Sequence, residues 1–201
     1  MVPIVELVSL ISMVDLNAFV IPGGKVFVYT GILKVAQTDD GLAAVLGHEI
    51  AHNLARHAAE RMSSTVFLEP LRWAFILADA AIGGNGQIGR ILGDLALGLG
   101  IERPASRVQE SEADYIGLLL MANGCYNPEA AVKMWQRMEE AQKASGQSIP
   151  EWFSTHPSNT NRIKKLQEWL PKAEEARAES GCATTIQYQQ DFQNVMKSLW
   201  H

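Results

Sequence analysis

The pentapeptide His48–Glu49–Ile50–Ala51–His52 has the residue types and the spacing of a metal site. Residues four apart on a helix lie one turn apart on the same face, so both imidazoles can reach one Zn²⁺ ion. Glu49 lies about 100° around the helix from His48 and can accept a proton from an attacking water. The motif predicts one zinc ion per chain and hydrolysis with Glu49 as general base. The alternative interpretation is a solvated helix with two stacked histidines.

The third ligand is expected in a later segment, because a catalytic zinc ion keeps three protein ligands and one open position. The segment 110–114 contains three carboxylates, Glu110, Glu112 and Asp114. Helical spacing defines a buried face beside them: Ala113, Ile116, Gly117 and Leu120. Glu110 and Asp114 flank that face, whereas Glu112 points away. We predict Glu110 as the ligand and Glu112 as a solvated surface charge. Asp114 is predicted to fix the tautomer of a zinc histidine, preferably His48. A surface salt-bridge pair is the alternative for Glu110 and Asp114.

Three other histidines need an interpretation. On a continuous helix His57 is rotated about 140° from His52, so a packing or capping role is predicted. His156 lies in a predicted loop and could donate to the oxyanion formed when water attacks the scissile carbonyl. Arg162 could do the same or anchor that loop. Both could equally be ordinary surface residues, and His201 is expected to play no part.

The elements that must position these residues are mostly helical. Strands are expected at 17–21 and 26–29 around a turn at 22–25, followed by a short helix. The motif helix is expected to begin at a cap at Thr38 or Asp39 and to run to about Met62. Later helices are expected at 66–80, 87–99, 107–123, from 127 onward, 159–170 and 184–199. The prediction is one α+β domain over 1–201, with a small sheet near the N-terminus.

Composition narrows the choice of partners. The 201 residues suffice for one domain with a core, and a net charge of −5 argues against nucleic acid as a partner. The two cysteines, Cys125 and Cys182, leave one bridge or two free thiols open. Charged residues interrupt the apolar stretch 66–101, so core helices are favoured over helices lying on a membrane. The segment 1–14 is expected to be neither a signal peptide nor a membrane span.

These motifs together resemble the zinc peptidases grouped with HtpX and the CAAX prenyl proteases, metallopeptidase family forty-eight. The resemblance covers about 16–170 and includes Asn17–Ala18–Phe19 and His156–Pro157. It implies a gluzincin-like fold, with 171–201 as a C-terminal helical extension. It also implies His48, His52 and Glu110 as ligands and Glu49 as base. His156 and Arg162 would then act on the transition state or the substrate.

Within this family, the segments 106–117 and 154–158 are most similar to mitochondrial Oma-type peptidases, and the tail resembles fungal members. The resemblance implies the mitochondrial inner membrane as the location, with a bacterial envelope as alternative. Such proteins carry a transit peptide and an anchor before this domain, and neither is recognised in this sequence. Residues 1–15 do not look like the family's first strand.

The function expected is a zinc endopeptidase that cuts membrane-associated or misfolded proteins. Strand 26–29, with Val26 and Val28, is predicted as an edge to which an extended substrate adds, beside Asn17 and Ala18. One alternative is a non-catalytic zinc-binding or chaperone-like module, against which the presence of Glu49 argues. Another is a membrane-surface scaffold built on 66–101, with structural zinc. The oligomeric state is left open.

Overall fold

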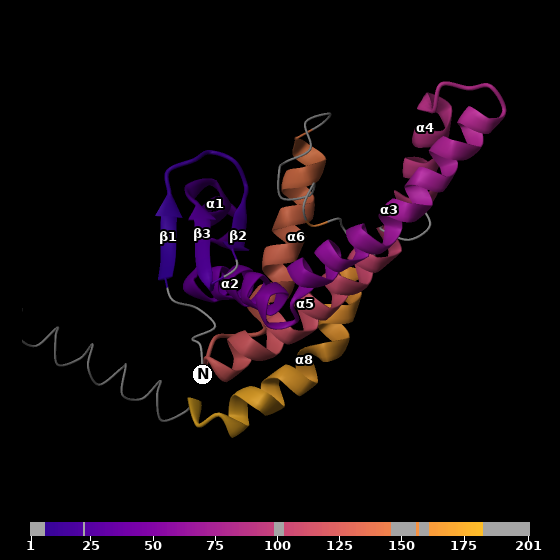
Figure 1. The fold of residues 1–201 in the computed structure, drawn as a ribbon. Coiled ribbons are helices and arrows are strands. Elements are labelled where there is room, and N and C mark those ends of the chain that lie inside the picture. Colours follow the sequence, from indigo (N-terminus) through magenta and orange to yellow (C-terminus); the bar gives the residue numbers. More distant parts are fainter. Residues whose placement is uncertain (1–6, 22, 99–102, 146–155, 157–160, 183–201) are drawn as a thin grey trace, which may run out of the picture.

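A small sheet lies at one side of a group of helices in the computed structural model, which describes residues 7–21, 23–98, 103–145, 156 and 161–182 (Figure 1). The strands are β1 (Leu7–Ile11), β2 (Ala18–Ile21) and β3 (Lys25–Tyr29), followed by the 3-10 helix η1 (Thr30–Ile32). The helices are α1 (Leu33–Ala36), α2 (Asp39–Leu54), α3 (His57–Ala81), α4 (Gln87–Leu97), α5 (Arg103–Asn123), α6 (Glu129–Ala144) and α8 (Arg162–Glu179). This architecture confirms the predicted α+β fold with a small N-terminal sheet. The helix expected at 184–199 lies outside the described residues, as does His201.

The sheet has the order β1-β3-β2, with β1 parallel and β2 antiparallel to β3. Strand β1 was not expected from the sequence, and its pairing places β3 in the middle of the sheet. The prediction that Val26 and Val28 form a substrate-binding edge is therefore wrong. Both side chains are buried in the core, and β3 has a partner strand on each side. Among the described strands, β2 forms the edge that faces the helices.

Helix α2 begins as predicted and ends earlier than predicted. The Thr38 hydroxyl accepts a hydrogen bond of 3.0 Å from the Gly41 N–H, which satisfies one free donor of the first turn. The helix ends at Leu54, not near Met62, because Arg56 takes a left-handed backbone conformation with φ of 59°. A new helix, α3, begins at His57 in a different direction. This break decides where the side chain of His57 lies.

Helices α2 and α5 pack closely, and two glycines make this possible. A Cβ built on Gly117 would lie 2.8 Å from the carbonyl carbon of Gly47, and one on Gly47 would lie 2.7 Å from the carbonyl oxygen of Gly117. No other residue type fits at either position without moving backbone. The crossing brings the motif of α2 next to the carboxylates of α5.

The carboxyl-terminal helices close the core around this crossing. Helix α8 continues through Pro171 to Glu179, beyond its expected end at 170. Ala173, in the predicted extension, is fully buried in the main core. A disulfide joins Cys125, after α5, to Cys182, after α8, with 5.2 Å between the Cα atoms. The described part of the extension therefore belongs to the same packed unit.

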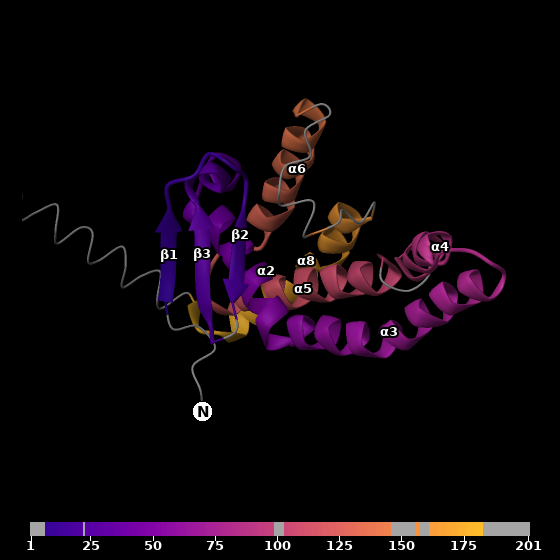
Figure 2. The ribbon, with the colours of Figure 1, turned by 45° about the horizontal axis from the view of Figure 1, so that its top comes forward.

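Helices α3 and α4 form a hairpin that projects from the rest of the chain (Figure 2). Their seam is built on small residues, since Gly89 and Gly93 lie directly against Phe75. Large apolar side chains remain exposed on the hairpin: Val66, Phe67, Leu71, Trp73, Leu77, Ile82, Ile88, Ile91, Leu92 and Leu95. Over the described residues, none of the helices is long and apolar enough to cross a membrane.

Candidate metal centre

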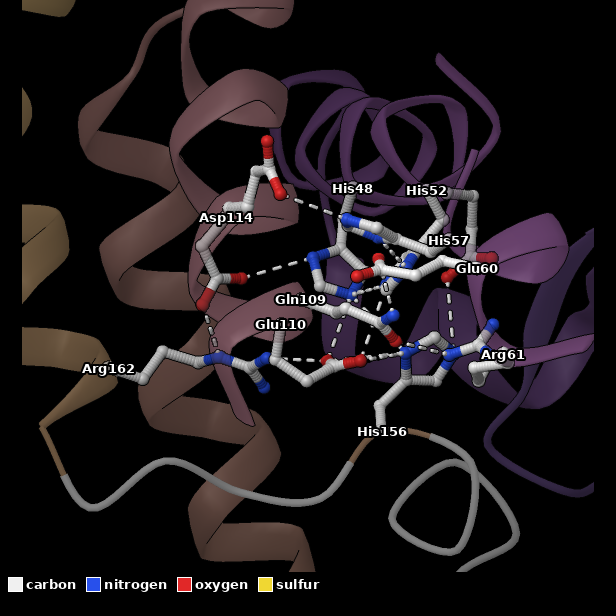
Figure 3. Close-up of polar contacts among 12 residues, drawn as sticks. His48, His52, His57, Glu60, Arg61, Gln109, Glu110, Asp114, His156 and Arg162 are labelled. Atoms are coloured by element: carbon white, nitrogen blue, oxygen red, sulfur yellow. Dashed lines mark hydrogen bonds and ion pairs between the residues drawn. The ribbon is translucent and has the colours of Figure 1, made fainter. Parts of the chain in front are cut away.

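Four side chains from three parts of the chain direct possible ligand atoms at one point: His48 and His52 of α2, Glu110 of α5, and His156 (Figure 3). The Nε2 atoms of the two α2 histidines lie 3.1 Å apart. Oε2 of Glu110 lies 3.4 Å from the Nε2 of His48, and Oε1 of Glu110 lies 3.4 Å from the Nε2 of His52. All four residues are buried, and their ligand atoms lie within 4.8 Å of one another.

This arrangement fits a tetrahedral metal ion. With metal–ligand distances of 2.0–2.1 Å, ligand atoms around tetrahedral zinc lie about 3.3 Å apart. The separations of 3.1 and 3.4 Å between His48, His52 and Glu110 agree with that value. Two histidines and a carboxylate are also the donor types found in catalytic zinc sites. The structure therefore holds a metal-binding group at the place that the sequence predicts.

Asp114 lies behind His48, as the helical spacing predicted. Its Oδ1 is 3.0 Å from the Nδ1 of His48, on the side of the ring that faces away from the ligand cluster. Its Oδ2 accepts a 2.6 Å hydrogen bond from the Nε of Arg162, whose Nη2 donates to Glu110 at 2.8 Å. The guanidinium carbon of Arg162 lies 3.8 Å from the ring centre of Trp135. In this arrangement Arg162 orients two carboxylates of the site.

His156 lies closer to the cluster than an oxyanion donor would need. Its Nδ1 is 3.3 Å from the Nε2 of His48 and 3.3 Å from both oxygens of Glu110, so it lies where a fourth ligand could sit, at the fourth vertex of a tetrahedral site. Hydrolysis requires one open position on the metal. An oxyanion role for His156 therefore requires its ring to leave this vertex. That role remains a prediction, as does a catalytic role for Arg162.

Glu49 is buried beside the cluster and does not belong to the ligand group. Its Oε1 lies 3.5 Å from the Nε2 of His156, and it is hydrogen bonded to the backbone of Val20 in β2. Only 2% of Glu49 is exposed, so the carboxylate is largely withdrawn from bulk water. This position agrees with a proton acceptor that touches the attacking water but not the metal.

Burial and the neighbouring charges shift the titration of the cluster in different directions. Burial lowers the pKa of His48, but hydrogen bonds with Asp114 and Glu110 outweigh this and raise it to about 9. Burial lowers the pKa of His52 to about 2, with a contribution from His48. For Glu110, burial raises the pKa, but hydrogen bonds from His156 and His48 outweigh burial and hold it below its ordinary value. Burial raises the pKa of Glu49. The raised pKa of His48 means that a proton would compete with a metal ion for this imidazole.

A cleft of about 410 Å³ opens beside the cluster, between β2 and α2. Its lining includes Asn17, Phe19 and Val20 from the sheet and Glu49 and His52 from α2. The Oδ1 of Asn17 is buried without a hydrogen-bond partner among the described residues. The cleft thus offers polar groups of the sheet next to the metal-binding group.

The backbone of β2 also faces this cleft. The Tyr29 N–H donates to the Asn17 carbonyl at 3.0 Å, so Asn17 is a hydrogen-bonded position of the β2–β3 ladder. Hydrogen-bonding direction alternates along an antiparallel strand, so the backbone groups of Ala18 and Val20 point away from β3. Ala18 is fully buried and does not line the cleft, so of these two residues only Val20 lies at its surface.

Two groups at the site were missed by sequence reasoning. His57 was expected to pack or to cap, yet its Nδ1 lies 2.8 Å from the Nδ1 of His52. Gln109 is buried and donates to Glu60 at 2.8 Å, while Arg61 donates to Gln109. Gln109 could have been singled out from the sequence, because it directly precedes the predicted ligand Glu110. The contact of His57 with His52 was not predicted, because it depends on the backbone break at Arg56.

Residues 5–170 match peptidase family M48, and the chain belongs to that family. This confirms the resemblance found from the motifs.

Among its relatives, the chain is 46% identical over 166 residues to the mitochondrial metalloendopeptidase OMA1 of Schizosaccharomyces pombe, covering 83% of this chain and 47% of that protein. It is 42% identical over 179 residues to the protein of the same name from Saccharomyces cerevisiae, covering 88% and 50%. A more distant relative is the β-barrel assembly-enhancing protease of Yersinia pestis, 28% identical over 152 residues, covering 74% and 31%. The chain spans about half the length of the two yeast proteins.

Proposed function

We propose that this chain is the catalytic domain of a zinc-dependent endopeptidase. One observation carries the proposal: two imidazole nitrogens and a carboxylate converge at tetrahedral spacing, with Glu49 buried beside them. A non-catalytic zinc-binding or chaperone-like module would need the same ligands but no general base. Membership of a peptidase family also favours the catalytic interpretation.

Each residue of the site has a separate proposed role in peptide hydrolysis. His48, His52 and Glu110 would hold the zinc ion, which when bound makes water more acidic and polarises the scissile carbonyl. Glu49 accepts the proton of the attacking water and passes it to the departing amine. Its pKa, raised by burial, brings it closer to the working pH and suits it to both transfers. His156, once off the fourth vertex, is within reach of the oxyanion.

The substrate is proposed to bind as an extended strand along β2. The outward backbone carbonyl of Val20 can accept a hydrogen bond from the substrate backbone, which selects an extended peptide and not a sequence, while the Val20 N–H donates to Glu49. The buried Oδ1 of Asn17 is available to a substrate N–H in the same cleft. The proposed binding strand is therefore β2 and not the predicted β3. Asn17 remains a proposed substrate-binding residue, whereas Ala18 is fully buried behind the cleft.

The natural substrates are proposed to be membrane-associated or misfolded proteins of the mitochondrial inner membrane. The names of the yeast relatives support the mitochondrion, and the distant bacterial relative leaves an envelope role as the second possibility. The exposed apolar side chains of α3 and α4 support contact with a membrane surface, since such patches on monomers mark interaction sites. In this location the cleft would meet polypeptides that leave the bilayer or fail to assemble in it.

The test is cleavage of casein, with the product ends identified by mass spectrometry. We expect cleavage that a chelator stops and that one equivalent of zinc restores. A protein that binds zinc tightly and cuts neither casein nor an unfolded membrane protein would instead be the non-catalytic module.

A further inference from the structure

The two histidines of α2 are supported in different ways on the ring side that faces away from the ligand cluster. Both present Nε2 to the cluster, at 3.1 Å from each other. The Nδ1 of His48 meets a carboxylate, that of Asp114, at 3.0 Å. The Nδ1 of His52 meets another imidazole nitrogen, the Nδ1 of His57, at 2.8 Å (Figure 3). The Nε2 of His57 in turn lies 3.2 Å from Oε2 of Glu112.

Only one arrangement of protons satisfies these contacts when His52 binds a metal through Nε2. The Nδ1 of His52 then carries its proton and must donate it. The Nδ1 of His57 must accept, because two N–H groups cannot face each other at 2.8 Å. The proton of a neutral His57 therefore lies on Nε2, where it is donated to Glu112. Glu112 fixes the tautomer of His57, and His57 fixes the tautomer and the orientation of His52.

The backbone conformation at Arg56 brings the side chain of His57 next to that of His52. On a helix continuing past Leu54, His57 would point away from His52. The chain instead breaks at Arg56, a non-glycine residue in the left-handed region, which is an uncommon and unfavourable conformation. After the break, His57 is fully buried at the start of α3, with its ring centre 4.9 Å from that of His52. Glu112, with a side chain 53% exposed, connects this ring to the surface.

We propose that His57 and Glu112 form a positioning pair for His52, the counterpart of Asp114 for His48. This proposal rests on the proposed zinc site. It gives a role to Glu112, which the sequence analysis predicted to be a solvated surface charge. His57 and Glu112 touch neither substrate nor metal, and they act through the orientation of His52. Partners of this kind behind zinc histidines typically change metal affinity by about 10–100-fold.

The test compares zinc affinity, measured by competition with a chromophoric chelator, among variants of the full chain. His57→Phe keeps a ring but removes the acceptor, and we expect its affinity to fall about 10–100-fold. His57→Asn places an amide oxygen close to the position of Nδ1 and should recover most of that loss. The visible spectrum of the Co²⁺-loaded protein should shift in His57→Phe and return towards the wild-type spectrum in His57→Asn.

A surface variant keeps the test decisive if His57→Phe does not fold. Glu112→Leu should lower zinc affinity by up to about tenfold, near the lower end for such partners. The matched control is Glu140→Leu, the same change at an exposed position of α6. Wild-type affinity in His57→Phe, equal loss in His57→Asn, or equal affinity in the Glu112 and Glu140 variants would overturn the proposal. Wild-type protein that binds no zinc would overturn the proposed function as well, whereas zinc binding without casein cleavage would remove only the catalytic part.

Discussion

The metal-binding cluster and the α3–α4 hairpin lie next to each other in the chain and depart from an ordinary globular surface in opposite ways. The cluster buries polar and charged side chains: His48, Glu49, His52, His57, Glu110, Asp114, His156 and Arg162. The hairpin exposes large apolar ones, such as Phe67 at 83% and Ile82 at 86%. Buried charges are costly unless paired, and exposed apolar patches are rare on monomers. Neither arrangement is explained by stability alone, so each indicates a function.

In the cluster, the buried charged side chains pair with one another, which offsets the free-energy cost of burying them. The described residues of the hairpin show no comparable compensation for its exposed apolar side chains. Arg162 holds both Glu110 and Asp114, and Asp114 holds His48. On the hairpin, Arg72 pairs with Glu69 and Asp94, while large apolar side chains remain exposed to solvent. The comparison predicts that substitutions in the cluster abolish peptide hydrolysis. Substitutions in the hairpin should alter only binding to a membrane surface.

The largest effect is expected for Glu49→Gln. Loss of the proton acceptor should lower kcat by about 10²–10⁴-fold. Zinc content should stay near one per chain, since Glu49 lies outside the ligand group. Steady-state kinetics on a fluorogenic peptide, with zinc measured in the same sample, checks both. Wild-type activity in a fully loaded variant would remove Glu49 as the base.

His156→Ala is expected to come next. If His156 donates to the oxyanion, kcat and kcat/KM should fall together by about 10²–10³-fold with zinc retained. If His156 instead holds the fourth vertex permanently, its removal should weaken zinc binding or free a position and increase the rate. An unchanged kcat/KM would remove His156 from the catalytic residues, and a change confined to KM would point to substrate binding.

Glu110→Ala and Glu112→Ala test how the carboxylates of α5 are assigned. Loss of a ligand should weaken zinc binding by more than about 10²-fold, beyond the upper range for groups behind a ligand. Glu112→Ala should cost no more than about tenfold, through His57. Equal retention of zinc in the two variants, by the same chelator competition, would show that the wrong carboxylate was chosen.

Local periodicity predicted most of this cluster. The spacing of His48 and His52 within one helix, and the face shared by Glu110 and Asp114 within another, depend only on neighbours along the chain. The same reasoning placed Asp114 behind His48, at the observed 3.0 Å. Helix starts at Thr38 and after Asn127 were also local signals and were confirmed.

What sequence reasoning missed depends on long-range choices or on strain. Strand β1 is defined by its parallel pairing with β3, and without it β3 was taken for an edge. The disulfide between Cys125 and Cys182 depends on how α5 and α8 pack. The left-handed residue Arg56 carries no glycine or proline signal, so the helix was extended through it and His57 was placed on the wrong face. These misses share one cause, because each needs the tertiary structure to become visible.

The smallest effect on chemistry is expected in the hairpin, where Phe67→Ser and Trp73→Ser should leave cleavage of a soluble peptide within about twofold of wild type. Fully burying one such side chain contributes about 1.5–3 kcal/mol, so each change should weaken binding to vesicles by roughly tenfold or more. Flotation with vesicles of zwitterionic and anionic phospholipids measures this, and Phe67→Leu is the matched control because it keeps an apolar side chain. Equal flotation of Phe67→Ser and Phe67→Leu would mean that the hairpin does not enter the bilayer. A large loss of peptide cleavage in the serine variants would show instead that the hairpin supports the cluster, and the division between the two regions would then fail.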